Sequence, residues 1–128
     1  MLFTWGMLLK GDILAKLFHW SFWLLIAAML YALGRRAAGA RVGRWAVALW
    51  AAIPLAGELA GLAYVDLGLT AFVLAGFYAF LGWTESQRDG WLVLCSLFIG
   101  FAMSTKYTAV TWSALLILLI IYHARRHH

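Results

Sequence analysis

Long apolar segments, separated by short clusters of charged residues, constrain this chain more than any other feature of its sequence. Of the 128 residues, 66% are hydrophobic and only 12% are charged. A soluble domain is roughly half apolar and about a quarter charged. One small core could not bury so much apolar surface, whereas a bilayer accepts apolar side chains on the outside of each helix. The sequence therefore predicts an integral membrane protein.

Five apolar runs approach the roughly 20 residues that a helix needs to cross a bilayer. We predict membrane-spanning helices over approximately 13–33, 45–64, 67–83, 91–103 and 108–122. The predicted links between them are short, and they cover residues 34–44, 65–66, 84–90 and 104–107. Short connections make consecutive helices antiparallel neighbours. The predicted fold is all-α, a polytopic transmembrane helical bundle that forms a single transmembrane domain over residues 1–128.

The distribution of cations predicts how this bundle is oriented, because positive residues accumulate on the cytoplasmic side. If the predicted links alternate between the two sides, all seven arginines share one side: Arg35, Arg36, Arg41, Arg44, Arg88, Arg125 and Arg126. The three lysines, Lys10, Lys16 and Lys106, share the other. We therefore expect the N-terminus outside, the C-terminus in the cytoplasm, and a multi-pass protein of the cell inner (plasma) membrane.

Three other interpretations of the composition are disfavoured. The net charge of +5 does not indicate nucleic-acid binding, because the arginines flank apolar runs and form no basic stripe on a polar fold. Cys95 is the single cysteine and offers neither a disulfide nor a metal-binding spacing. His19 and His123 fall near opposite ends of the predicted bundle, so they cannot clamp one haem. A haem or pigment is not expected, and the cofactor is unknown apart from a candidate divalent cation.

Glu58 is the most unusual residue, because it is a carboxylate inside an apolar run. One turn earlier, Pro54 lacks the N–H that would bond the carbonyl of Trp50 and can kink the helix. A carboxylate at this depth costs roughly 3 kcal/mol on insertion scales, so it should face a protein interior or a water-filled cavity. Two interpretations stay open: an acidic group lining an outward-facing cavity, or a protonated or hydrogen-bonded group that joins helices.

Asp66 and Lys106 are both predicted at the outer surface. Asp66 precedes the third apolar run, where it can cap the helix, bind a divalent cation or accept a hydrogen bond from a substrate hydroxyl. Lys106 precedes the fifth run. An anionic phosphate would suit it there, next to the start of a helix, although a lysine at this depth also simply extends its ammonium to the headgroup level. The residues alone do not decide between these roles.

Two stretches resemble the membrane core of GT-C glycosyltransferases: AYVDLGLTAFVLAGFYAFLGW (63–83), which follows Pro54 and Glu58, and GWLVLCSLFIGFAMSTKYTA (90–109). They are most similar to the branch of aminoarabinose transferases and protein O-mannosyltransferase-like proteins. There, a proline-containing helix leads to an outer turn with Asp, and a later helix ends in G-x-A-x-x-x-K-Y-T. The residues that match this ending are Gly100, Ala102, Lys106, Tyr107 and Thr108. Residues 11–36 also resemble the second helix of that family, so the resemblance covers helices two to six.

The resemblance implies transfer of a sugar from a polyprenyl-phosphate carrier to an acceptor on the outer face. In such enzymes acidic residues bind the acceptor, a metal or both, and basic residues hold the lipid phosphate. Asp66 matches the aspartate in the outer turn, and Lys106 matches the lysine that ends the later helix. The candidate substrate- and phosphate-binding residues are therefore Asp66, Lys106, Glu58 and Tyr107, with Asp66 as the candidate metal ligand. No catalytic residue is assigned.

The sequence also departs from this family. Its members have a first transmembrane helix and a large outer loop with the usual catalytic acid, and they continue for several more helices. Nothing here corresponds to those parts, so we expect little catalysis by this chain alone. One hypothesis is a fragment of a polyprenyl-phosphate-sugar-dependent GT-C glycosyltransferase, completed by a partner chain. The alternative is a non-catalytic accessory or structural transmembrane subunit of a larger membrane protein complex. Both imply the lipid bilayer and other transmembrane subunits as partners, and the first adds a polyprenyl-phosphate sugar.

Overall fold

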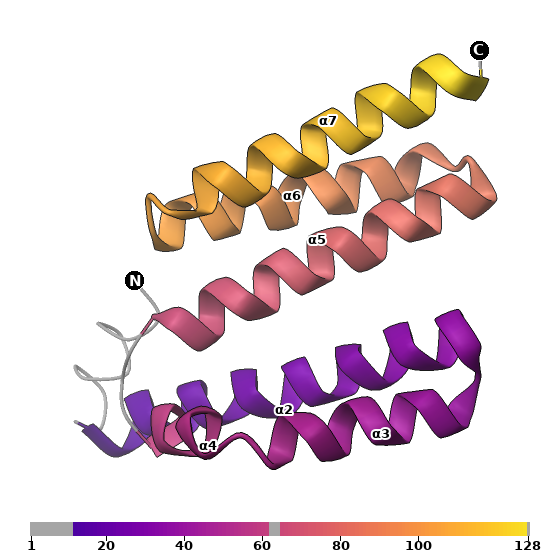
Figure 1. Cartoon of the computed structure of the whole chain (residues 1–128). Helices are drawn as coiled ribbons and strands as arrows, with labels where there is room; N and C mark the ends of the chain where they lie inside the picture. The colour runs from indigo at the N-terminus through magenta and orange to yellow at the C-terminus, as the bar shows by residue number, and fades with distance from the viewer. Residues whose placement is uncertain (1–11, 62–64, 128) are drawn as a thin grey trace. The chain divides into compact units, whose positions relative to one another are not determined.

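The computed structural model describes residues 12–61 and 65–127 of the chain. Within these ranges every regular element is an α-helix, as Figure 1 shows. The helices are α2 (Asp12–Ala38), α3 (Ala40–Ala51), α4 (Pro54–Gly61), α5 (Asp66–Ser86), α6 (Asp89–Thr105) and α7 (Ala109–His127). The prediction of an all-α fold is confirmed for this part of the chain.

The helices gather into two compact units, residues 1–71 and residues 72–128. The first unit contains α2, α3, α4 and the first turns of α5, and α2 packs against both α3 and α4. The second unit contains the rest of α5 with α6 and α7, which pack against each other. A single transmembrane domain over 1–128 stays a prediction.

One residue, Gly39, connects α2 to α3. Its φ of 89° lies in the left-handed region that glycine adopts without steric cost. The sequence predicts a link over 34–44, and that prediction is wrong, because helix occupies every described position there except Gly39. The physical reason is that arginine and alanine, which dominate this stretch, are good helix formers despite their position between two apolar runs. The four arginines of this stretch are therefore carried on helices, two at the end of α2 and two at the start of α3.

The second predicted span, 45–64, is not one continuous helix. Helix α3 ends at Ala51, and α4 starts at Pro54, whose missing N–H is harmless at a first helical position. The carbonyl of Trp50, which loses its usual partner to the proline, accepts a hydrogen bond from Ile53 N–H at 3.3 Å. The sequence predicts one span that Pro54 can kink, whereas in the structure the helix is interrupted between Ala51 and Pro54. The last residues of the predicted span, 62–64, lie outside the described residues.

The core of the second unit is built from side chains of α5, α6 and α7, among them two large aromatic rings. Its buried members are Ala79, Phe80, Trp83, Cys95 and Leu116. Cys95 is fully buried, and Gly82 lies so close under the indole ring of Trp91 that an added Cβ would be 2.6 Å from it. Helix α5 ends at Ser86, and the next residue, Gln87, reverses the chain with a φ of 53°. The N–H of Gln87 donates to the carbonyl of Trp83 at 2.8 Å.

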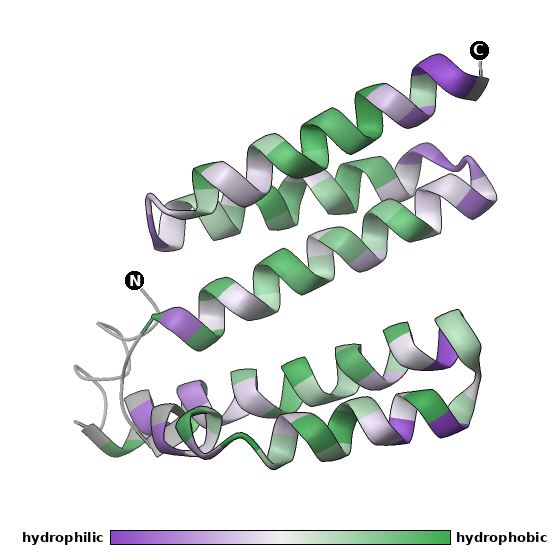
Figure 2. Ribbon diagram, viewed as in Figure 1, coloured by the Kyte–Doolittle hydropathy of each residue, from purple (hydrophilic) through white to green (hydrophobic). Residues whose placement is uncertain are grey.

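Three helical segments are long and apolar enough to cross a membrane: Lys16–Ala38, Asp66–Ser86 and Ala109–Arg126. Helix α6 is equally apolar but has only 17 residues. Figure 2 shows the apolar residues in the middle of α5, α6 and α7 and the polar residues gathered at their ends. The chain is a helical membrane protein on these grounds. Five crossings, and the orientation of the termini, stay predictions.

Candidate functional site

Asp66 opens helix α5 and is held there by local hydrogen bonds and packing. The hydroxyl of Thr70 donates to the carbonyl of Asp66 at 2.9 Å, which closes the first turn. The next residue, Leu67, is buried, and a Cβ added to Gly68 would lie 3.6 Å from the ring of Phe22 on α2. The start of α5 therefore packs on α2, and this packing fixes the place from which the half-buried carboxyl group of Asp66 projects.

The structure adds a residue to this place, namely His19 of α2. His19 is fully buried and shares one face of the helix with Phe22 and Ile26, three and seven positions further on. Phe22 lies against the start of α5, and His19 lies one turn away on α2, within electrostatic range of the Asp66 carboxylate. The sequence pattern does not link the two residues, because the link is a tertiary contact. The available signal is that both are polar and fall at the same predicted end of the bundle.

Glu58 projects from α4, a helix of eight residues. Ala56 is buried, and Glu58, two positions later, is exposed. Because a helix turns about 100° per residue, two positions place side chains on nearly opposite faces. The sequence predicts that the carboxylate of Glu58 faces a protein interior or a water-filled cavity. The described part of this chain does not enclose Glu58 in this way, because its side chain is exposed. The reason is the rotation of α4, which turns Ala56 toward the rest of the first unit and Glu58 away from it.

Lys106, Tyr107 and Thr108 form the link between α6 and α7. Lys106 caps α6 in an extended conformation, and its N–H donates to the carbonyl of Ala102 at 3.3 Å. Tyr107 is 83% exposed. The first two N–H groups of α7, those of Ala109 and Val110, donate to the carbonyls of Lys106 and Tyr107 at 3.0 and 3.1 Å. These two groups are therefore engaged within the link.

The hydroxyl groups that precede this link are engaged as well. Ser104 and Thr105 both donate to the carbonyl of Phe101, each at 2.8 Å. An anion at this end of α7 would thus rely less on backbone and serine donors than the sequence suggests. The ammonium group of Lys106 and the phenol of Tyr107 are the groups whose chemistry suits it, because a charged donor binds phosphate more strongly than a neutral one.

The candidate residues fall into both units. Asp66 lies with His19 in the first unit, whereas Lys106 and Tyr107 lie in the second. Their joint action on one substrate stays a prediction. A divalent cation such as Ca²⁺ takes about six to eight oxygen ligands, and Mg²⁺ about six including water. Within residues 12–61 and 65–127 no three His, Cys, Asp or Glu side chains gather as a metal site. Asp66 could supply one carboxylate ligand, and the remaining ligands would come from water or substrate.

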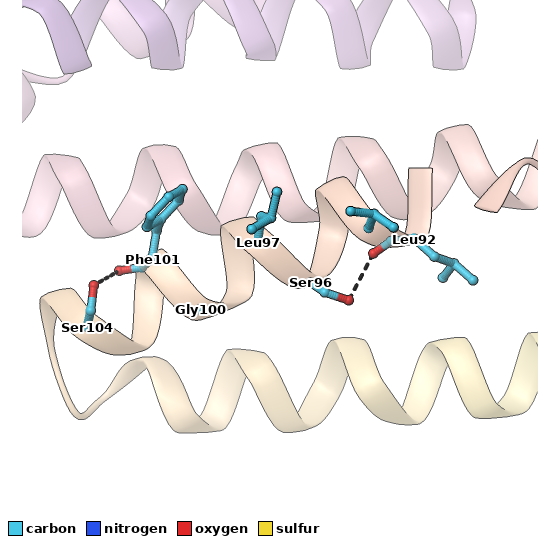
Figure 3. Close-up of a pocket in the computed structure, with 7 residues that line it drawn as sticks. Leu92, Ser96, Leu97, Gly100, Phe101 and Ser104 are labelled. Carbon is cyan, nitrogen blue, oxygen red and sulfur yellow. Dashed lines mark hydrogen bonds between the residues drawn. The ribbon is translucent and has the colours of Figure 1, made fainter. Parts of the chain in front are cut away.

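A groove of about 680 Å³ runs along the exposed face of α6 (Figure 3). Its walls are apolar or small residues: Leu92, Val93, Ser96, Leu97, Gly100, Phe101 and Ser104. The hydroxyl of Ser96 donates to the carbonyl of Leu92 at 2.9 Å, as that of Ser104 does to Phe101. With these protons directed into their own helix, the groove suits an apolar surface better than a polar substrate.

Comparison with known proteins adds one positive result. Residues 6–128 match the sequence profile of a family described as dolichyl-phosphate-mannose-protein mannosyltransferase. The match includes α2 to α7 and all four candidate residues. Neither the curated proteins nor the solved structures gave a match.

Proposed function

The chain belongs to the dolichyl-phosphate-mannose-protein mannosyltransferase family, and from this premise we propose that it forms part of a GT-C glycosyltransferase that uses a polyprenyl-phosphate sugar. The observation that carries the proposal is the match over residues 6–128, together with apolar helices suited to a bilayer. A lipid-linked donor requires a membrane-embedded site, and this chain provides membrane helices with a carboxylate and a lysine at helix ends.

In this proposal the candidate residues take the roles that their chemistry allows. Lys106 and Tyr107 contact the phosphate of the donor, since an ammonium and a phenol both donate hydrogen bonds to phosphate oxygens. Asp66 accepts a hydrogen bond from the acceptor hydroxyl or supplies one ligand to a divalent cation, and His19 fixes its position. Glu58 contributes a further acidic group at the same side. All of these roles depend on an outer location for the two helix ends.

The proposed topology follows the distribution of cations. Helices α2, α5 and α7 each make one crossing of the cell inner membrane in this proposal. A fourth crossing is made by α3 and α4 together, and a fifth by α6, with the N-terminus outside. Neither α3 nor α4 is long enough to span by itself, so the break at Pro54 lies within the membrane in this arrangement. A broken helix is tolerated at that depth where it is covered by protein or lines a cavity. The exposed Glu58 just beyond the break is consistent with such a cavity, completed by another chain.

We propose further that these residues alone do not catalyse transfer. Sugar transfer to a hydroxyl needs a positioned group that removes its proton and a site closed to water. Among the carboxylates whose burial the structure describes, Glu58, Glu85 and Asp89 are exposed and Asp66 is half-buried, so none of these four lies in an enclosed site. In this proposal a further acid and the rest of the site come from outside the described residues and close around the donor.

A second function is an accessory or structural transmembrane subunit of a larger complex. The observation that favours it is the α6 groove, where Ser96, Gly100 and Ser104 recur at every fourth position of an exposed helix face. Small residues at this spacing let another helix approach closely in a membrane. This function needs neither a donor nor a catalytic acid.

A donor-binding experiment separates the two functions. The chain, purified together with whatever copurifies with it, is titrated in nanodiscs with a polyprenyl-phosphate sugar. If the chain is part of a transferase and keeps the donor site, the polyprenyl-phosphate sugar should bind saturably. Lys106→Ala should then weaken its binding about tenfold, because one charge-assisted hydrogen bond is lost. The matched control is Lys16→Ala, which removes an exposed lysine predicted on the same side and leaves binding unchanged. Absence of binding in the complete complex, or equal losses in both variants, contradicts the proposed site.

A further inference from the structure

Helix α7 has two chemically different faces in the second unit. Along one face, Ala109, Ser113 and Leu116 are buried against neighbouring helices. Along the other, Leu118 and Tyr122 are each 63% exposed. The buried face continues to His123, which packs edge-on against Trp83 with ring centres 5.1 Å apart. The helix is therefore fixed in rotation, and its exposed face has a defined direction.

A shallow groove of about 370 Å³ lies on that exposed face at the C-terminal end of α7. Its walls are Leu118, Ile121, Tyr122, Arg125 and Arg126. Spacings of three and four residues place these side chains on one side of the helix. The apolar walls lie toward the middle of the helix, and the two arginines lie at its end. Arg126 also donates from Nη1 to the hydroxyl oxygen of Tyr122 at 3.5 Å, which joins the charged end to the phenol.

The charge at this end is not neutralised within the described chain. Neither Arg125 nor Arg126 forms an ion pair with a carboxylate of residues 12–61 or 65–127. The end of a helix carries about half a negative charge, which two guanidinium groups outweigh. Each guanidinium presents five N–H donors in a planar fork that matches the oxygens of a phosphate. The groove therefore combines an anion-binding end with an apolar channel.

The position of the groove in the membrane identifies the ligand. Residues Ala109–Arg126 are long and apolar enough to cross a bilayer, so Arg125 and Arg126 come at the end of the span, at the level of the headgroups. Leu118 lies seven residues earlier, which is about 10 Å deeper at 1.5 Å per residue. A phospholipid has its phosphate and its acyl chains separated in the same way. This placement holds whichever side of the membrane the C-terminus occupies.

We propose that this groove is a binding site for one anionic phospholipid. The phosphate accepts hydrogen bonds from Arg125 and Arg126 and from the hydroxyl of Tyr122, and an acyl chain lies against Leu118 and Ile121. The site is separate from the proposed sugar transfer, since none of its residues takes part in donor or acceptor binding. It would keep one lipid on α7 after detergent extraction, which a diffuse attraction between arginines and a charged membrane would not.

Native mass spectrometry of the purified full chain tests this site by counting retained lipids. We expect saturable binding of one phosphatidylglycerol in preference to phosphatidylcholine. The double variant Arg125→Gln, Arg126→Gln should lower its apparent affinity at least about tenfold, because two charge-assisted hydrogen bonds are lost. Tyr122→Phe should cause a smaller loss of about threefold, since the phenol is an uncharged donor and binds phosphate less strongly than a guanidinium does. All three residues are exposed, so the fold should tolerate these changes.

A matched control distinguishes a site from general charge. Arg35→Gln with Arg36→Gln removes the same charge from the last turns of α2 and should leave the retained lipid in place. Equal losses in the two double variants, or unchanged binding in the α7 variant, overturn the proposal. Inorganic phosphate and short-chain phosphatidylglycerol complete the test. If either displaces the long-chain lipid at equal concentration, the apolar walls contribute nothing and the site is an anion site only, which also contradicts the proposal.

Discussion

The two units of this chain bring their helices together in opposite ways. In the first, α2 and α3 approach backbone to backbone, and a Cβ added to Gly34 would lie 2.8 Å from the Cα of Gly43. In the second, helices are held apart by aromatic and aliphatic side chains around Phe80, Trp83 and Leu116. Both are solutions to packing without a hydrophobic driving force between helices, since in lipid the gain comes from close van der Waals contact.

The difference extends to the polar residues. The first unit has its helices interrupted at Gly39 and Pro54, and it carries both acidic candidates, Glu58 and Asp66. The second unit has long uninterrupted helices, and its candidates, Lys106 and Tyr107, stand in the link between two of them. Interrupted helices expose backbone and side-chain polar groups that a continuous span would hide. In the proposed function, substrate chemistry belongs to the helix ends, whereas we expect the aromatic core to provide stability. Each of these two expectations can be tested by substitution.

Removal of a large core side chain should have the greatest effect. Leu116→Ala in the second unit deletes a side chain that is only 4% exposed, and it should lower the free energy of unfolding by about 3 kcal/mol through lost contacts and the cavity left behind. Its control is Leu118→Ala on the same helix, where the side chain is 63% exposed and the loss should stay below about 1 kcal/mol. Unfolding in mixed detergent, followed by tryptophan fluorescence, measures both. Equal losses would show that the second unit is not held together by this core.

Adding a methyl group where α2 and α3 meet backbone to backbone should have the next largest effect on the free energy of unfolding. Gly43→Ala places a methyl group 2.6 Å from the carbonyl oxygen of Tyr31, so α2 and α3 must separate, and we expect a loss of about 2 kcal/mol. The control, Gly100→Ala in α6, meets no atom within 4 Å and should gain about 0.5–1 kcal/mol, because alanine is the better helix former. The two changes are chemically identical, so opposite signs in the same unfolding assay would confirm the contrast between the units. If Gly43→Ala leaves the free energy of unfolding unchanged or raises it, the proposed contrast between the two units is wrong.

Neutralising the acid at the start of α5 tests the chemical half of the comparison. Asp66→Asn should lower transferase activity of the complete complex about tenfold, about 1.4 kcal/mol, if its charge contacts acceptor or cation. Asp89→Asn is a close control, because Asp89 also stands in the first turn of a helix but in the second unit. His19→Gln should produce part of the Asp66→Asn loss without changing donor affinity, since it acts on the position of Asp66. Full activity in Asp66→Asn would show that the site assignment is wrong.

The sequence predicts elements well where a long apolar run ends in a polar cluster. The predicted helices 67–83 and 108–122 correspond to α5 and α7, each extended by a few residues. The connection through 34–44 could not be predicted in this way, because its charged residues suggest a link while their helix propensity continues α2 to Ala38. The position of Asp66 at the start of a helix can be predicted from the sequence, whereas the proximity of His19 to Asp66 cannot. That proximity depends on the packing of Phe22 on Gly68, which no local pattern encodes.

Replacing Pro54, which separates α3 from α4, should give the smallest change in the free energy of unfolding and the clearest change in helical content. Pro54→Ala restores the N–H that a continuous helix needs, and alanine favours helix more than proline by about 3 kcal/mol in a helix interior. Most of this gain should be cancelled, because α4 packs on α2 in its present direction and Ala56 would lose its burial if α3 continued straight. We expect a net change within about 1 kcal/mol, with helical circular dichroism raised by the residues that join α3 to α4. An unchanged spectrum would mean that packing, and not the proline, breaks the helix, and the interruption of the first unit would then be a property of its tertiary contacts.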